Sequence, residues 1–249
     1  MNLDFFQNIA WFRLSLYLIL STFFLGNLAT FLKKNLFSES GYSRKINHFG
    51  HMVISTPLLA FLPANILIPT VLVGSVLVIL IYGLSSYSQK EYIYGIVNGS
   101  LRETDGIKKR FFFFFPLITG NLALVISVLI YPLDFVRVAF FTVAFADGFA
   151  EPAGLRFGKN NNYSVRDYIW GGYNKKSIAG STTVFLFSFV ICFIFHIILN
   201  KDVYSTFKIS LIYGLLISII EAVSPRGTDN MNILLVAPLI VLFLQFFFK

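Results

Sequence analysis

Long apolar segments follow one another along most of this chain. Of its 249 residues, 56% are hydrophobic and 13% are charged, whereas a typical soluble domain carries about 25% charged residues. A helix needs about 20 mostly apolar residues to cross a bilayer. We therefore predict an all-α protein, a polytopic bundle of about eight transmembrane helices. The predicted spans are residues 8–32, 49–64, 66–85, 111–131, 133–150, 178–199, 203–223 and 230–248.

The segment 49–64 is the weakest of these spans, because it is short and contains Pro57 and Pro63. A re-entrant segment at this point would reduce the number of spans to seven. No soluble stretch stands apart from the spans, so we expect a single integral membrane domain over residues 1–249. Cys192 is the sole cysteine of the sequence, which excludes a disulfide framework and a cysteine metal cluster.

Lysine and arginine are concentrated in alternate loops of the predicted bundle. Fifteen of the 20 basic residues lie in four loops, at 33–48, 86–110, 151–177 and 224–229. Eight spans place all four loops on one side, and an excess of basic residues marks the cytoplasmic side. We therefore predict a multi-pass protein with its polar loops in the cytoplasm and both termini outside. The net charge of +8 then suits anionic lipids, and nucleic-acid binding is not expected.

A polar segment at 147–181 interrupts the apolar pattern between two predicted spans. Asp147 and Glu151 open it, four residues apart, and a helix would place both on one face. Carboxylates at a helix end can hold a divalent cation or accept a proton, so both acids are candidate catalytic residues. A capping or solvated position explains one such acid well, but explains the pair less well.

The same segment combines glycines with basic residues. Glycine lets backbone N–H groups approach a phosphate, and a helix N-terminus near 178 can bind an anion. The spacing Gly154-x-x-x-Gly158-Lys159 differs from a Walker A loop, which has four residues between its glycines. Helix packing through these glycines is disfavoured by the neighbouring charges. The candidate nucleotide-binding residues of this cytosolic loop and its helix ends are Gly154, Arg156, Gly158, Lys159, Lys176, Ser177, Gly180 and Ser181.

Further acids follow the apolar run that ends near residue 220. Glu221 closes that run, and Asp229 and Asn230 open the next one. Acids at the depth of a membrane or its interface are costly and point to function. Ion pairing of Glu221 with Arg226 is the structural alternative. The predicted topology returns all three residues to the face that bears Asp147, so we predict that Asp147, Glu221, Asp229 and Asn230 hold Mg²⁺.

A basic and histidine-containing segment precedes the second predicted span. Arg44 and Lys45 are followed by His48 and His51. Two histidines without a third ligand on the same face are a poor metal site. Anchoring to lipid phosphates is one role for the basic pair, and binding of a nucleotide or a product phosphate by Arg44, Lys45 and His48 is the other.

Taken together, these motifs resemble the CTP-dependent lipid kinases, a family that comprises dolichol kinase, phytol and farnesol kinases and a fungal diacylglycerol kinase. The family pattern has an early Arg-Lys-x-x-His, then Asp-Gly-x-Ala-(Glu/Asp)-x-x-Gly-x-x-x-Gly, then Lys-Ser-x-(Ala/Glu)-Gly-(Ser/Thr), and a late Glu and Asp-Asn. The resemblance covers about residues 44–240, with the motifs in the family's order, and the size suits the phytol kinase branch. The stretch between Gly158 and Lys176 is longer than in the family. The matching residues are Arg44, Lys45, His48, Asp147, Gly148, Ala150, Glu151, Gly154, Gly158, Lys176, Ser177, Ala179, Gly180, Ser181, Glu221, Asp229 and Asn230.

The resemblance implies transfer of a phosphoryl group from CTP to a long-chain isoprenoid alcohol such as phytol, farnesol or dolichol, with Mg²⁺ as cofactor. The acids would bind the cation or accept the alcohol proton, and the basic residues and glycines would hold the phosphates. Two alternatives stay open. One is cytidylyl transfer from CTP to phosphatidate, and the other is a cation-coupled transporter, against which stands the scarcity of polar residues within the predicted spans.

Overall fold

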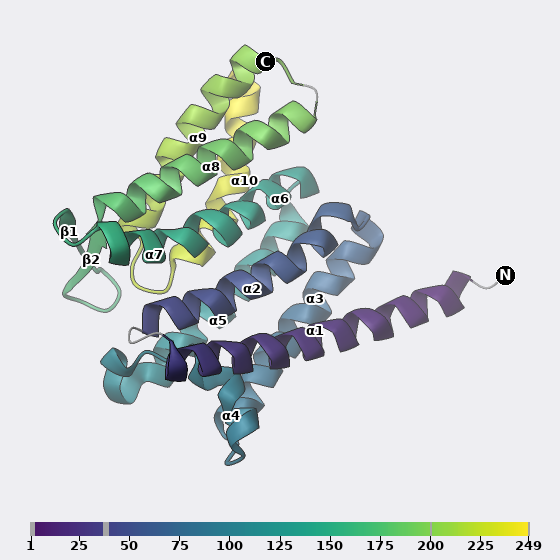
Figure 1. Cartoon of the computed structure of the whole chain (residues 1–249). Helices are drawn as coiled ribbons and strands as arrows, with labels where there is room; N and C mark the ends of the chain where they lie inside the picture. The colour runs from purple at the N-terminus through teal and green to yellow at the C-terminus, as the bar shows by residue number, and fades with distance from the viewer. Residues whose placement is uncertain (1–2, 37–39, 200, 249) are drawn as a thin grey trace. The chain divides into compact units, whose positions relative to one another are not determined.

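The computed structural model describes residues 3–36, 40–199 and 201–248, and most of them are helical (Figure 1). The internal contacts of the chain divide it into two compact units, Met1–Phe114 and Phe115–Lys249. In chain order the elements are α1 (Leu3–Asn35), α2 (Ser40–Phe61), α3 (Ala64–Ser86), α4 (Glu91–Asn98), the short 3₁₀ helix η1 (Glu103–Lys108), α5 (Lys109–Ile130), α6 (Leu133–Phe141), the π-helical η2 (Thr142–Asp147), α7 (Gly148–Phe157), β1 (Asn162–Arg166), β2 (Tyr173–Ser177), α8 (Ile178–Ile198), α9 (Val203–Val223) and α10 (Asp229–Phe247).

Six helical segments of the described residues are long and apolar enough to cross a membrane. They confirm a helical membrane protein, but not the predicted number of spans. The expected span 49–64 is the second half of α2, and 133–150 falls in the consecutive helices α6, η2 and α7; neither is among the six. The six segments are Leu16–Asn35, Ala64–Ser86, Asp105–Ile130, Ile178–Ile198, Val203–Val223 and Asp229–Phe247.

In the first unit, α1 packs closely on α4. A Cβ on Gly26 would lie 2.3 Å from the carbonyl oxygen of Ile96, so the two helices touch through their backbones. The Thr30 hydroxyl donates to the Gly95 carbonyl at 2.5 Å. Lys33 donates to the carbonyls of Asn98 and Leu101, just beyond α4, at 3.1 and 2.8 Å. A cation at the carboxyl end of a helix satisfies its free carbonyl groups, which fixes α4 against α1.

The second unit is built around a helical run from Leu133 to Phe157. Val138, Ala139, Val143 and Ala144 have no exposed surface, because α8 and α10 pack against this run. Its middle, η2, is π-helical, a form that accommodates an extra residue and often occurs at functional sites. The π-helical turn ends at Asp147, so this carboxylate follows a change in the helical repeat.

Helices α8 and α9 form the most extensive contact of the second unit. Gly214 of α9 allows the approach, since a Cβ there would lie 2.9 Å from the carbonyl oxygen of Phe185. Ser188, Cys192 and Ser210 are fully buried in these two helices, and small side chains of this kind let membrane helices pack closely. Large apolar side chains such as Leu186 and Leu215 are half exposed on the outside, as expected of a surface that faces lipid.

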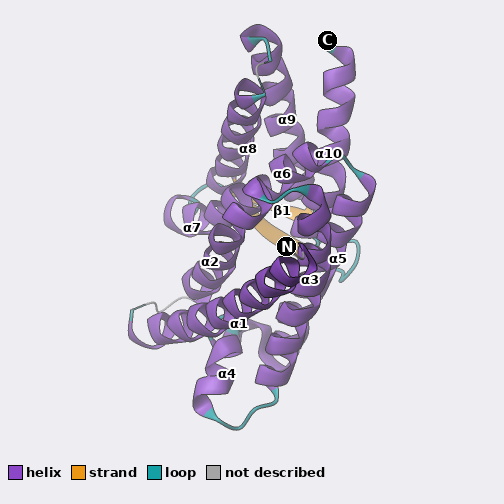
Figure 2. Ribbon diagram, turned by 90° about the vertical axis from the view of Figure 1, so that its right-hand side faces the viewer, coloured by secondary structure: helices purple, strands orange, loops and turns teal. Residues whose placement is uncertain are grey.

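A two-stranded antiparallel sheet interrupts the helices between α7 and α8 (orange in Figure 2). We expected a loop and helix ends in this region. Asn162 pairs with Ser177 and Arg166 with Tyr173. Gly171 and Gly172 both adopt positive φ, at 75° and 80°, in the connecting loop. That conformation favours glycine, and it lets the chain reverse so that β1 and β2 form a hairpin.

Candidate functional site

Three carboxylates from different elements meet at one end of the second unit. Asp147 ends η2, Glu221 lies in the last turn of α9, and Asp229 is the first residue of α10. One oxygen atom of each lies within 4.8 Å of the others, so the three form a cluster of possible metal ligands. Asp147 and Glu221 are 4% and 5% exposed. We call these three residues the carboxylate cluster.

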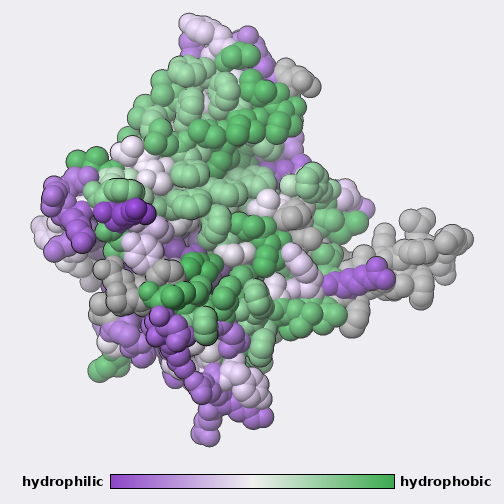
Figure 3. All heavy atoms as spheres, in the orientation of Figure 1, coloured by the Kyte–Doolittle hydropathy of each residue, from purple (hydrophilic) through white to green (hydrophobic). Residues whose placement is uncertain are grey.

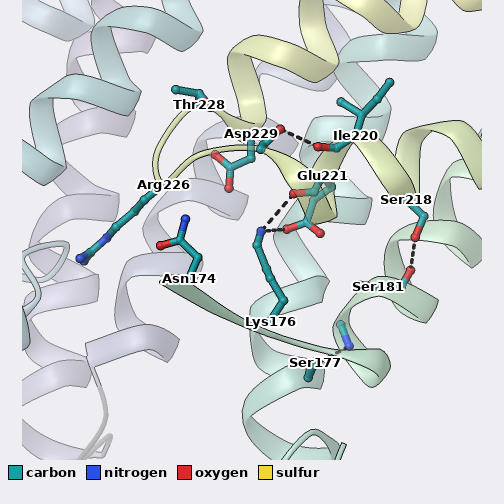
Figure 4. Close-up of polar contacts among 12 residues, drawn as sticks. Asn174, Lys176, Ser177, Ser181, Ser218, Ile220, Glu221, Arg226, Thr228 and Asp229 are labelled. Carbon is teal, nitrogen blue, oxygen red and sulfur yellow. Dashed lines mark hydrogen bonds and ion pairs between the residues drawn. The ribbon is translucent and has the colours of Figure 1, made fainter. Parts of the chain in front are cut away.

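Lys176 of β2 is the cationic partner of this cluster (Figure 4). Its ammonium forms a short ion pair with the Glu221 carboxylate and also donates to the Glu221 carbonyl at 3.2 Å. Burial opposes a charge on Lys176, but the carboxylate cluster outweighs it and raises the pKa of the ammonium above its usual value. The cluster therefore combines grouped carboxylates with a charged ammonium.

Asp167 fixes the loop between α9 and α10, although sequence analysis did not select it. Its side chain is buried at the end of β1 and accepts hydrogen bonds from the backbone of Ile169 and Trp170 and from the Asn174 amide. It also accepts the backbone N–H of Arg226 at 3.1 Å. Burial alone would raise the pKa of Asp167, but these donors outweigh it and lower the pKa below its usual value.

Trp170 makes the second contact with the same loop. Its indole N–H donates to the Arg226 carbonyl at 3.0 Å, and its ring meets the Phe115 ring edge to face at 5.1 Å. Asp167 and Trp170 therefore hold both backbone groups of Arg226. The hairpin thus positions Lys176 from one strand and, through Arg226, the loop that connects Glu221 to Asp229.

The N-terminus of α8 lies beside the carboxylate cluster, and backbone N–H groups at this helix end already donate to acceptors of the protein. The Ser177 hydroxyl accepts the Gly180 N–H at 3.1 Å, and the Ile178 N–H donates to the Asn161 carbonyl at 3.0 Å. Ser181 is held by the Tyr163 hydroxyl at 2.5 Å. A phosphate at this helix end would have to take over the hydrogen bonds that these groups already make.

The two glycines of α7 take part in close packing. A Cβ on Gly158 would lie 2.6 Å from the Ser177 Cβ, and one on Gly154 would lie 2.9 Å from the Ser177 hydroxyl. We had considered packing through these glycines unlikely because of the charges nearby, and that interpretation was wrong. The charges do not interfere, because Arg156 and Lys159 are exposed. The Gly158 N–H donates to the Gly154 carbonyl at 2.8 Å.

The remaining candidates lie outside the carboxylate cluster. Glu151 is half-buried in the first turn of α7 and is not among the grouped carboxylates. The Asn230 Oδ1 atom is buried and has no hydrogen-bond partner among the described residues, and a Cβ built on Gly120 would lie 3.8 Å from the Asn230 Cβ. Arg156 places its guanidinium over the Phe157 ring. Arg44, Lys45 and His48 belong to α2 in the first unit, so their role at a nucleotide stays a prediction.

Sequence signals for the missed residues were weak but present. Asp167 precedes Gly171 and Gly172, and an aspartate close to glycines often accepts backbone N–H groups in a turn. Residues 162–166 alternate between polar side chains and the larger Tyr163 and Val165, as a strand would, but residues 173–177 show no such alternation. The contacts of the Arg226 backbone with Asp167 and Trp170 could not be predicted, because every residue type except proline offers the same N–H and carbonyl groups.

Comparisons of the chain with protein-family models, with curated proteins and with solved structures find no match.

Proposed function

We propose that this protein is a membrane kinase that transfers the terminal phosphoryl group of CTP to a long-chain isoprenoid alcohol. The observation that carries the proposal is the meeting of Asp147, Glu221 and Asp229 with Lys176, from four separate elements. Phosphoryl transfer depends mainly on positioning and charge neutralisation, and this set supplies both. The choice of CTP and of an isoprenoid alcohol rests on the sequence motifs alone.

The carboxylate cluster fits a hard divalent cation such as Mg²⁺. Its ligands are carboxylate oxygen atoms from three different elements, and these atoms lie within 4.8 Å of one another. Asp229 and Glu221 would hold the cation, with Asp147 as a third ligand. Mg²⁺ would neutralise charge on the phosphates. The Asn230 Oδ1 atom, which is buried and has no partner within the described part of the chain, is a further candidate ligand next to Asp229 in the sequence.

In the proposed reaction, the alcohol oxygen attacks the terminal phosphorus of CTP, and the bond from that phosphorus to the bridging oxygen breaks. CDP leaves, and the alcohol proton passes to a carboxylate. Asp147 is the proposed acceptor, because it is buried beside the ion pair of Lys176 and Glu221. Lys176 then contacts the transferred phosphate as a point charge. The lipid tail lies along the exposed apolar surface of the spans.

Labelled CTP tests the proposal against its nearest alternative. Purified protein is incubated with Mg²⁺, a panel of lipid alcohols and phosphatidate, and CTP labelled at either the α or the γ phosphate. A kinase transfers the γ label to the alcohol and releases CDP. A phosphatidate cytidylyltransferase transfers the α label to lipid and releases pyrophosphate. Lipid that gains neither label, with ATP tried as a second donor, would overturn both assignments.

We further propose that the carboxylate cluster faces the cytoplasm, because the 151–177 segment is rich in basic residues. A topology with six spans and one with eight spans both place the loops 36–48, 151–177 and 224–228 on the same side of the membrane. The two topologies differ in the side on which the 86–104 loop lies. Cysteine introduced at Lys159 in a Cys192→Ser background should be labelled only from the cytoplasm. A cysteine introduced at Lys90 distinguishes six spans from eight. Labelling of this cysteine from the cytoplasm would require that α2 and the α6–α7 run cross the membrane. Labelling of Lys159 from outside would contradict the proposed orientation.

A further inference from the structure

The β1–β2 hairpin has two faces of different character. Side chains alternate along a strand, and the inward residues Tyr163, Asn174 and Lys176 bond to Ser181, Asp167 and Glu221 respectively. That set makes the inner face part of the site. The outward residues of the strands are exposed, and they include Ser164, Arg166, Tyr173 and Lys175.

The outer face carries positive charge, and within the described ranges of the chain no acid forms an ion pair with it. Arg166 and Lys175 are exposed on the strands, and Lys159 is exposed just before β1. Between residues 152 and 201 the sequence contains a single acid, Asp167. Asp167 is buried, and both of its oxygens accept hydrogen bonds from the hairpin and from Arg226. The surface charge of the hairpin is therefore wholly basic.

The hairpin must also lie at the edge of the bilayer. β2 ends at Ser177, and the apolar helix α8 begins at the next residue, Ile178. In Figure 3 hydrophilic side chains gather over β1 and β2, beside the hydrophobic surface of α8. Tyr168 and Tyr173 are 77% and 73% exposed. Tyrosines with basic residues are typical of the interface between lipid and water.

We propose that the outer face of this hairpin binds the headgroups of anionic phospholipids. Arg166 and Lys175 contact the phosphates, and Tyr168 and Tyr173 lie at the level of the headgroups. The Arg166 guanidinium already lies over the Tyr168 ring, 5.6 Å from its centre, so cation and aromatic ring form one surface. Because the inner face carries Lys176 and the loop holds Arg226, lipid bound outside restrains the same strands that position the carboxylate cluster.

Trp170 provides a probe that does not depend on enzymatic activity. The sequence has two tryptophans, so Trp11→Phe leaves Trp170, at the tip of the hairpin, as the sole emitter. The protein is reconstituted in phosphatidylcholine vesicles that contain brominated phosphatidylglycerol or brominated phosphatidylcholine at equal mole fraction. Quenching then gives the relative binding constant of the two lipids. Each basic residue near an anionic surface contributes about a fivefold preference at low salt, so phosphatidylglycerol should bind at least about fivefold better.

Charge variants complete the test. Arg166→Gln with Lys175→Gln should bring the preference close to one, and high salt should do the same. Arg166→Lys with Lys175→Arg should preserve it. Lys201→Gln is the control and should change nothing, because Lys201 is exposed at the opposite end of α8.

Three results would overturn the proposal. Equal quenching by the two lipids, or no quenching by either, would show that the outer face does not bind anionic headgroups. A preference that survives the double glutamine variant would place lipid binding elsewhere. A raised KM for CTP in that variant, with the lipid preference unchanged, would assign the outer face to the nucleotide.

Discussion

The two units each bury a polar group of side chains, and the two groups differ in charge. In the first unit, the Asn47 amide donates to the Tyr82 and Ser100 hydroxyls at 2.8 and 2.6 Å, and His51 meets the same Tyr82 hydroxyl at 2.9 Å. We call Asn47, His51, Tyr82 and Ser100 the Asn47 network. It contains no carboxylate or ammonium, and its members satisfy one another.

The carboxylate cluster of the second unit is instead built from charged groups. Lys176 pairs with Glu221, and Asp147 and Glu221 are almost fully buried. Burying charged groups is costly even when they are paired. A neutral network of hydrogen bonds is enough to join helices, whereas grouped carboxylates are the ligands that a hard divalent cation prefers. We therefore infer a structural role for the Asn47 network and a binding role for the carboxylate cluster.

The largest expected effect is the loss of activity when a cluster carboxylate becomes neutral. Asp147→Asn keeps the shape of the side chain but removes its charge, and turnover in the labelled-CTP assay should fall by about a hundredfold or more. Asp134→Asn is the matched control, because Asp134 is half exposed and pairs with Arg137 three residues away. Near-normal turnover in Asp147→Asn would make Asp147 a structural residue like those of the Asn47 network.

The next effect concerns the Asn47 network itself. Asn47→Ala leaves the Tyr82 and Ser100 hydroxyls without their buried partner, which should cost about 2 kcal/mol of stability. The thermal unfolding midpoint in detergent should fall, while the Mg²⁺ concentration for half activity stays the same. A changed Mg²⁺ requirement in this variant would show that the Asn47 network affects cation binding and is not purely structural.

Lys176 and Lys175 test the charge of the cluster, since they are neighbours on opposite faces of β2. Lys176→Met removes the ammonium that pairs with Glu221, so Mn²⁺ or Mg²⁺ should bind about tenfold more tightly to the protein without nucleotide. Lys175→Met should leave that affinity unchanged, because Lys175 is exposed on the outer face. Weaker cation binding in Lys176→Met would instead show that the ion pair holds Glu221 in place.

The smallest effect concerns pH, because the gain in cation affinity caused by Lys176→Met should not depend on it. The pKa of Lys176 is raised above its usual value of 10.5. Its ion pair therefore contributes fully at lower pH and is lost only as the pH rises through the raised pKa. The ratio of cation affinities between Lys176→Met and the unaltered protein should stay constant from about pH 6 to about pH 9. A ratio that shrinks toward pH 9 would mean that the ammonium loses its proton in this range.

Local composition made part of this structure predictable. Apolar runs of about 20 residues gave α3, α5, α8, α9 and α10 to within a few residues at most ends, because lipid leaves the helix as the only way to satisfy the backbone of such a segment. The same runs did not give the number of spans, since α2 and the α6–α7 run carry polar residues, prolines or a π-helical turn. Hydropathy alone does not decide whether such helices cross.

The sequence by itself determined which residues had the chemistry of a site. Glu221 was selected because an acid at the end of an apolar run is costly without a purpose. Asp147 was selected for its position at a helix end four residues before Glu151, and Lys176 because a lysine beside glycines can balance the charge of a phosphate. Only the tertiary structure decided that Lys176 pairs with Glu221, that Glu151 lies outside the cluster, and that Gly154 and Gly158 pack on Ser177. It also revealed Asp167, whose role depends on the backbone of Arg226, 59 residues away. Residue type sets charge and size, but contacts between distant segments follow from how the helices and the hairpin pack, which no local pattern encodes.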